Sequence, residues 1–123
     1  MAGAAENIGQ LKYISLETFK KSGEGVKTPV WFVATEGVIY VATGRSTGKA
    51  KRIANNPRVR FAPCTFRGGI KGDWTEGSAE QLSGEEEISI MGLRKKKYGV
   101  MSLLSGLAGR SKGGMTVYRI KED

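Results

Sequence analysis

The sequence predicts a mainly β protein with about six short antiparallel strands, arranged as a barrel or a sandwich. Segments rich in β-branched and aromatic residues recur along the chain, and glycine-containing polar turns separate them. Beyond the first ten residues, two segments have helical character: a short one between the third and fourth strands, and a longer one before the last strand. The expected strands span residues 12–19, 28–35, 38–43, 58–66, 71–82 and 115–120.

Turn signals bound the first three strands. The polar segment 20–25 (KKSGEG) separates the first strand from the second, and Glu36-Gly37 separates the second from the third. Because a short glycine-containing turn is typical of a hairpin, the second and third strands are expected to pair. Residues 1–10 are expected to form a short helix or a mobile chain end.

The fourth strand contains Pro63, which has no N–H to donate to a neighbouring strand. This indicates an edge position or a bulge. Residues 67–69, which are rich in glycine, join this strand to the weakly alternating fifth strand, and the two are expected to pair. Cys64 lies in an apolar run and is expected to be a buried thiol.

The short helix has clear start and stop signals. Ser46 or Thr47 can cap a helical body over residues 49–55. Asn56-Pro57 follows and is expected to end the helix.

The longer helical segment follows Ser83-Gly84 and begins with three glutamates, which suit the positive end of a helix. Because glycine disfavours helix, a break is expected near Tyr98-Gly99. The basic run at residues 94–97 (RKKK) is interpreted as a solvated helix face.

The composition favours an anionic partner and a second subunit. The 123 residues are expected to form one domain. The modest apolar share of 39% favours burial against another copy of the chain. The net charge of +8 fits nucleic acid, a membrane surface or a phosphorylated small molecule. The alternative is a solvated surface without a specific partner.

Two scarce residue types exclude several classes of enzyme. The chain has no histidine, which removes histidine-based triads and histidine metal sites. Its single cysteine excludes an intrachain disulfide and a cysteine-cluster zinc site. Any catalysis is therefore expected to depend on a bound cofactor. No apolar run has transmembrane length and the start does not resemble a signal peptide, so a cytoplasmic protein is expected.

The segment 40–64 carries the main chemical signal, because a strand leads through a hydroxyl- and glycine-rich turn into a helix start. Free N–H groups at a helix N-terminus bind phosphate well when cations are nearby. The cations and hydroxyl side chains are Arg45, Lys49, Lys51, Arg52, Thr43, Ser46 and Thr47. The alternative is a capped surface helix with solvated lysines.

A nucleotide P-loop does not fit this turn. That motif needs four residues between its two glycines and a Ser or Thr after the lysine. Here three residues separate Gly44 from Gly48, and Ala50 follows Lys49. Hydrolysis of ATP or GTP is therefore not expected.

The order of these motifs resembles the flavin-binding split-barrel superfamily of pyridoxamine 5′-phosphate oxidase. The resemblance rests on TPVWF, VIYVAT and STGKAKRIANNPRV, followed by Arg67-Gly68 and a Lys-Tyr-Gly motif at 97–99. It extends over residues 13–120 and is strongest to small members described as F-420-dependent enzymes.

The resemblance implies a six-stranded antiparallel split β-barrel of the Greek-key type, with the short helix inserted and the helical segment before the last strand. It also implies a homodimer that binds FMN or coenzyme F-420, and less favourably FAD, between its subunits. Members that oxidise pyridoxamine phosphate are longer and use a C-terminal Arg and His. Because this chain has no histidine, vitamin B6 oxidation is not expected.

The resemblance also assigns roles to residues. Lys49 matches the lysine that binds the cofactor phosphate, and the hydroxyls of Thr43, Ser46 and Thr47 surround it. The strand at Pro29, Val30 and Trp31 matches the one along the isoalloxazine ring. The basic pair Lys51 and Arg52 is suited to an acidic cofactor tail. Arg67 and Trp74 are candidates to close the site from the second subunit. As alternatives, Trp31 is a core or interface aromatic and Trp74 a surface or interface residue.

Two classes of function follow from this resemblance. The first is an oxidoreductase that transfers a hydride between the bound cofactor and a small substrate. The second is a flavin carrier, store or redox sensor without turnover. Nucleic-acid binding is a third hypothesis that the charge alone favours, but the sequence has no recognised reading helix or aromatic stripe.

Overall fold

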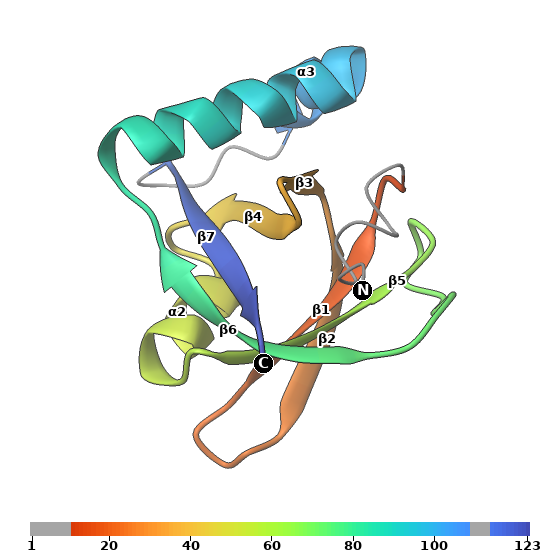
Figure 1. Cartoon of the computed structure of the whole chain (residues 1–123), viewed down its shortest axis with the longest axis vertical. Coiled ribbons are helices and arrows are strands. Elements are labelled where there is room, and N and C mark those ends of the chain that lie inside the picture. Colours follow the sequence, from red (N-terminus) through yellow and green to blue (C-terminus); the bar gives the residue numbers. More distant parts are fainter. Residues whose placement is uncertain (1–10, 109–113) are drawn as a thin grey trace.

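The computed structural model describes residues 11–108 and 114–123, so the expectation for residues 1–10 lies outside the described residues. Seven strands form one antiparallel sheet in the order β2-β1-β5-β6-β7-β4-β3 (Figure 1). The strands are β1 (Ile14–Phe19), β2 (Gly25–Val30), β3 (Phe32–Thr35), β4 (Val38–Gly44), β5 (Arg58–Pro63), β6 (Thr75–Gln81) and β7 (Met115–Glu122).

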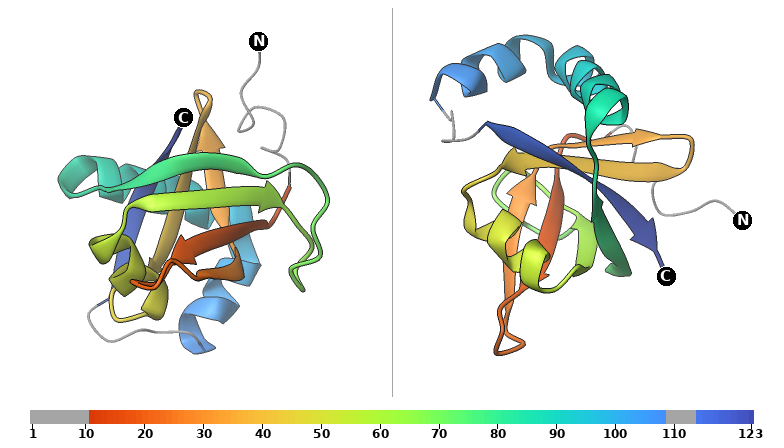
Figure 2. Two further views of the ribbon diagram at one scale, coloured as in Figure 1. Left: turned by 90° about the horizontal axis from the view of Figure 1, so that it is seen from below. Right: turned by 90° about the vertical axis from the view of Figure 1, so that its left-hand side faces the viewer.

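The predicted strand over residues 28–35 is in fact two strands, so the expected count of six is wrong. β2 pairs with β1 at one edge of the sheet, whereas β3 pairs with β4 at the other edge. Only Trp31 separates β2 from β3. The sheet therefore curls, so that its two edge strands, β2 and β3, follow one another directly along the chain (Figure 2). We call their junction at Trp31 and Phe32 the seam. An alternating local pattern cannot reveal this change of partner, because it records burial and not pairing.

The hairpin between β3 and β4 is confirmed. Thr35 pairs with Val38 across the turn Glu36-Gly37. Both turn residues have positive φ, 52° at Glu36 and 77° at Gly37. This is the turn geometry that matches the natural twist of two strands joined by two residues.

The predicted strands 58–66 and 71–82 are too long. Pro63 is not on an edge strand, but it lies beyond the part of β5 that pairs on both sides, so the expectation that it interrupts a central strand agrees with the pairing. β5 is an inner strand, paired with β1 on one side and β6 on the other. Pairing with β6 covers only Arg58–Phe61, however, so Pro63 lacks an N–H where β6 does not reach. Beyond it, a single bridge joins Cys64 to Ile70. Cys64 is buried, as expected, and burial raises the pKa of its thiol.

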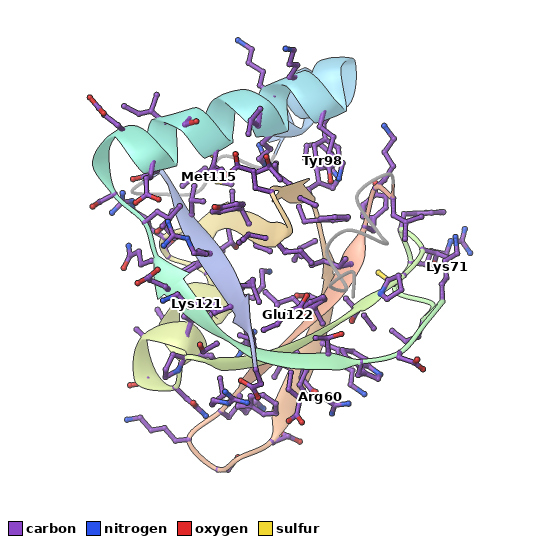
Figure 3. The ribbon with its side chains drawn as sticks, viewed as in Figure 1. Arg60, Lys71, Tyr98, Met115, Lys121 and Glu122 are labelled. Atoms are coloured by element: carbon purple, nitrogen blue, oxygen red, sulfur yellow. The ribbon has the colours of Figure 1, made fainter. Side chains whose placement is uncertain are left out.

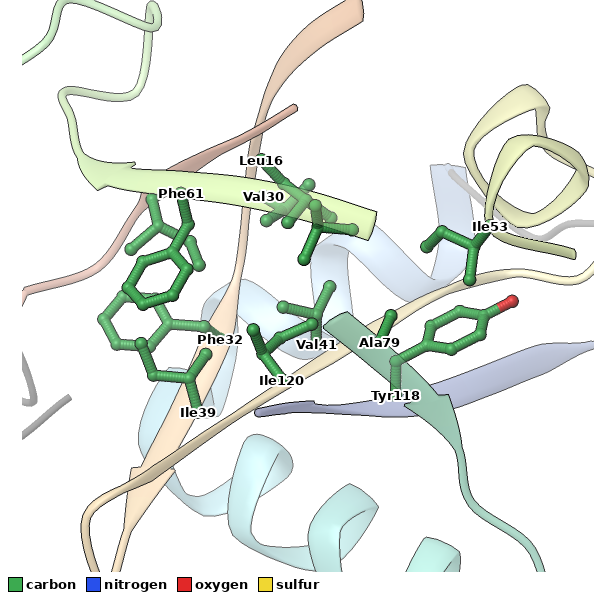
Figure 4. Close-up of a cluster of buried hydrophobic side chains, with 12 residues drawn as sticks. Leu16, Val30, Phe32, Ile39, Val41, Ile53, Phe61, Ala79, Tyr118 and Ile120 are labelled. Atoms are coloured by element: carbon green, nitrogen blue, oxygen red, sulfur yellow. The ribbon is translucent and has the colours of Figure 1, made fainter. Parts of the chain in front are cut away.

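The core fills the inside of the curled sheet (Figure 4). Its fully buried side chains come from alternate positions of the strands, as a sheet with one covered face requires. Helix α2 (Gly48–Asn55) adds Ile53 and covers one end of this core. The largest core residues are Phe32, Phe61, Ile14, Leu16, Ile39 and Ile120.

Both helices confirm the sequence signals. Thr47 is the N-cap of α2 and Asn56 its C-cap, one residue before Pro57. Helix α3 (Gly84–Ala108) has a kink at Gly99, where φ is 49°. It lies across the opposite side of the sheet from α2, where Ile90 packs against Val117 (Figures 1 and 2). No helix within the described residues is long and apolar enough to span a membrane.

Candidate functional site

Two threonines meet where β4 runs into α2. Thr43 is buried at the end of β4, and its hydroxyl lies 3.3 Å from that of Thr47. The Thr47 hydroxyl donates to the carbonyl of Gly44 at 2.8 Å and accepts from the N–H of Ala50 at 3.3 Å. Because the Thr47 proton is directed at Gly44, Thr43 is the donor between the two hydroxyls. Thr47 is thus held by the cap, whereas the contact with Thr47 is the one hydrogen bond of the Thr43 hydroxyl among the described residues.

Two cations lie beside this helix start. Lys49 is half-buried, and burial together with the neighbouring charge of Arg52 lowers the pKa of its ammonium group. Arg52 folds back along the helix and donates through Nε to the hydroxyl of Thr18 at 2.7 Å. Its Nη1 would lie 2.7 Å from a Cβ at position 48, so Gly48 leaves room for the guanidinium.

We call these residues the α2 corner: Thr18, Thr43, Thr47, Lys49 and Arg52. Neither of its cations forms an ion pair with a carboxylate among the described residues. A half-buried cation without a counterion is held at an energetic disadvantage. Together with the N–H groups of a helix start, the corner therefore fits a phosphate or another small anion.

The structure brings only part of the predicted phosphate group together. Thr43, Thr47, Lys49 and Arg52 share the corner, as the local spacing requires. Ser46 and Lys51 lie close by in the chain but are exposed. The Arg45 side chain is not part of the corner, because its Nε donates to the carbonyl of Met115 at 3.1 Å.

Trp74 lies on the other face of the sheet from the α2 corner. Its ring lies under Lys27 and Arg60, at 5.1 and 4.9 Å from the ring centroid. Arg60 in turn pairs with buried Glu17 at 3.1 Å. Glu17 and Thr18 are consecutive on β1, so their side chains point to opposite faces. Trp74 therefore covers the outer face, whereas Thr18 faces the corner.

Arg67 and Pro29 also lie away from the corner. The β5–β6 loop folds back toward β2, where a Cβ at Gly68 would lie 3.9 Å from Pro29 Cδ. Arg67 is exposed and lies over the ring of Phe66, 5.3 Å from its centroid. The role of Arg67 and Trp74 toward a second subunit stays a prediction.

Trp31 is occupied by contacts within the chain. Its ring stacks on Tyr98, with centroids 4.2 Å apart and planes 5° from parallel, and Arg94 lies 4.9 Å from its centroid. This supports the core reading of the Trp31 side chain. The Val30 side chain points into the core. The backbone of Pro29, Val30 and Trp31, rather than their side chains, therefore stays the candidate contact for the isoalloxazine ring of a cofactor.

Tyr98, which is labelled in Figure 3, closes the seam together with its neighbour Lys97. The Tyr98 hydroxyl accepts from the N–H of Phe32 at 2.9 Å and lies 2.8 Å from the carbonyl oxygen of Lys12, to which it can donate. Lys97 donates to the carbonyl of Phe32 at 2.9 Å. Burial raises the pKa of Tyr98 to about 12 and, with the charge of Lys12, lowers that of Lys97 to about 8.

The expectation of a solvated face at 94–97 is therefore wrong for half of the run. Lys95 and Lys96 are exposed, as expected. Arg94 and Lys97 are half-buried against aromatic rings, because α3 crosses the seam at this point. Thr18 was not predicted as a site residue, because its contact with Arg52 joins residues that are 34 positions apart in the sequence.

Comparison with solved structures identifies the fold. The chain is similar to HutZ, the heme storage protein from Vibrio cholerae, with a TM-score of 0.71, 14% identity, and coverage of 100% of this chain and 92% of HutZ. It is similar to an FAD-binding protein from Mesorhizobium loti, with a TM-score of 0.64, 16% identity, and 97% and 87% coverage. It is also similar to a candidate pyridoxamine 5′-phosphate oxidase from Listeria innocua, with a TM-score of 0.63, 15% identity, and coverage of 97% of this chain and 93% of the other.

These similarities define the chain as a protein with the split β-barrel fold of the pyridoxamine 5′-phosphate oxidase type. Two other similar structures are longer, and the chain spans 53% and 51% of their lengths. No family model matches the sequence, and no protein of curated function matches it either.

Proposed function

We propose that the chain binds a phosphate-bearing flavin, FMN or the deazaflavin coenzyme F-420, and acts as an oxidoreductase. The single observation that carries this proposal is the α2 corner. It combines a helix start, the Thr43 hydroxyl and two cations that lack a carboxylate partner among the described residues. One similar fold belongs to an FAD-binding protein, which supports a flavin as the ligand.

The division of work follows from the residues present. When bound, the cofactor would supply the hydride chemistry, which no amino-acid side chain supplies. Lys49 and Arg52 bind the phosphate, and Thr43 turns its hydroxyl toward it. The exposed Lys51 extends the positive charge along α2. This extension and the net charge of +8 favour F-420, whose phosphate and oligoglutamate tail is strongly anionic, over FMN, and FAD is the least favoured.

We propose further that the protein is a homodimer with the cofactor between its subunits. The modest apolar share supports it, as does the position of Arg67 and Trp74, which lie away from the α2 corner of their own chain. Light scattering is expected to give about twice 13.3 kDa. A monomer that binds the cofactor with full affinity would contradict a shared site.

A storage or carrier role is the second candidate, because HutZ is a heme storage protein with a similar fold. Heme itself fits this chain less well, since its commonest axial ligand is histidine and the chain has none. A flavin carrier or redox sensor needs the same corner but no substrate.

The experiment first identifies the ligand and then tests whether the bound ligand reacts. The ligand that copurifies with the protein is released and identified by absorption and mass spectrometry. FMN and F-420 are each expected to raise the melting temperature through binding to the native state, whereas riboflavin raises it less. Reduction of bound cofactor by a nicotinamide, or transfer to an added acceptor, supports the oxidoreductase. Binding without either reaction supports the carrier. Strong DNA binding without any response to flavins would overturn both.

A further inference from the structure

The outer edge of β3 is partly open. Thr35 and Val38 flank a two-residue turn, so they form a hydrogen-bonded pair. Because bonded and non-bonded pairs alternate along an antiparallel ladder, Val33 also bonds toward β4. The N–H and C=O groups of Phe32 and Ala34 therefore point away from β4, along the free edge of the sheet.

Helix α3 satisfies one of these two residues. The hydroxyl of Tyr98 and the ammonium group of Lys97 take the place that a neighbouring strand would occupy beside Phe32. At Ala34, no partner for the outward N–H and C=O occurs in the part of the chain that the structure describes. An unpaired edge of this kind is a template for another extended chain.

An open hollow of about 280 Å³ lies beside Ala34. We call it the β3–α3 hollow, lined by Val33, Ala34, Thr35, Leu93, Lys96 and Lys97. Leu93 is 38% exposed and gives the hollow an apolar contact. The volume is slightly below the usual range of ligand pockets, about 300–1,000 Å³, which limits an occupant to a few residues.

Both charged residues that line the hollow, Lys96 and Lys97, are cations. In the first half of α3, Glu86 pairs with Arg119 and Glu87 with Arg45. At the middle of α3, the cations of residues 94–97 form no ion pair with a described carboxylate. The hollow is therefore complementary to an occupant that carries a carboxylate.

We propose that the β3–α3 hollow binds a short extended peptide segment of a partner protein, with an acidic side chain flanked by apolar ones. The peptide backbone pairs with Ala34 at the edge of β3, in the manner of strand addition. Its carboxylate lies beside Lys96, and an apolar side chain on the same face of the peptide contacts Leu93. This site does not depend on the proposed cofactor, because it lies at the opposite end of β4 from the α2 corner.

The probe is a fluorescent peptide of sequence Val-Thr-Glu-Thr-Val, in which the valines and the glutamate share one face of a strand. Fluorescence anisotropy with the full chain, at an ionic strength of about 0.15 M, measures its binding. We expect saturable binding at submillimolar concentrations. A peptide with lysine in place of glutamate, and one N-methylated where its backbone meets Ala34, should each bind at least about tenfold more weakly.

Two variants test the contacts proposed for the hollow, and a third serves as the control. Ala34→Pro removes the outward N–H and leaves the hydrogen bonds between β3 and β4 in place, which an edge strand tolerates, and should weaken binding at least about tenfold. Lys96→Gln should weaken it about threefold to tenfold. The control Lys95→Gln removes a charge that is also exposed but does not line the hollow, and should stay within about twofold.

Four outcomes would overturn the proposal. The peptide fails to bind, or it binds equally well when N-methylated, which indicates adsorption by charge. Duplex DNA displaces the peptide, and the binding of DNA depends on Lys95 as much as on Lys96, which indicates a nucleic-acid surface. Self-association that Ala34→Pro abolishes, without peptide binding, indicates a second copy at this edge. The N-methylated peptide keeps the test valid if Ala34→Pro does not fold.

Discussion

Two groups of basic residues differ in what faces them. At the α2 corner, Lys49 and Arg52 lie beside hydroxyl groups and a helix start. On α3, Arg94 lies over the ring of Trp31, and Lys97 lies over that of Phe32 while donating to a backbone carbonyl. The α3 cations therefore hold the seam of the barrel, whereas the α2 cations remain available to an anion. Residue type and charge alone do not distinguish these roles.

The rest of the surface makes the difference clearer. Arg58 pairs with Asp123, and Arg119 with Glu80 and Glu86. Exposed pairs of this kind stabilise the fold by little. They do neutralise these cations locally, whereas the cations of the α2 corner and of residues 94–97 form no ion pair with a described carboxylate.

The largest effect is expected at the seam. Tyr98→Phe removes the acceptor of the buried Phe32 N–H and the donor to a nearby carbonyl. The free energy of unfolding, measured in urea, should fall by about 2–4 kcal/mol. Tyr13→Phe is the control, because the Tyr13 hydroxyl has no hydrogen bond within the described residues, and it should change stability by less than about 0.5 kcal/mol. Equal effects of the two variants would show that Tyr98 does not hold the seam.

A smaller effect is expected at the α2 corner. Thr47→Ala removes the cap of α2 and should lower the free energy of unfolding by about 1 kcal/mol. Thr47→Ser keeps the hydroxyl and should stay close to the wild type. If both variants lose the same amount, the methyl group rather than the cap is what stabilises this end of the helix.

A third effect is expected in the pH dependence of stability, where the half-buried Lys97 ammonium group is partly screened by solvent. Its pKa of about 8 in the folded chain is below the usual 10.5. Between these values the unfolded chain binds a proton that the folded chain does not, so stability rises with pH. Over pH 8 to 10 this contribution should be present in the wild type and absent from Lys97→Met, as measured by urea unfolding. Parallel pH profiles of the two proteins would contradict the lowered pKa.

Local signals were sufficient for the helix of the α2 corner and not for the seam. A hydroxyl cap, a basic helix body and Asn56-Pro57 lie within a dozen residues, so they predict α2 almost to the residue. The contact between Tyr98 and Phe32 spans 66 positions. It depends on how far the sheet curls, which no short window of sequence contains. The strand break at Trp31 and the burial of Arg94 and Lys97 were missed for this same reason.

The central claim is that the α2 corner binds the phosphate of a flavin. The most direct test titrates the wild type and Lys49→Ala with FMN and riboflavin, and with F-420 in parallel, using Lys21→Ala as the control for an exposed charge. Lys49→Ala should weaken binding of FMN and F-420 by about 1.5–3 kcal/mol, roughly ten- to a hundredfold, with riboflavin unaffected. Equal affinities of the variant and the wild type for both phosphorylated ligands would show that the phosphate is bound elsewhere.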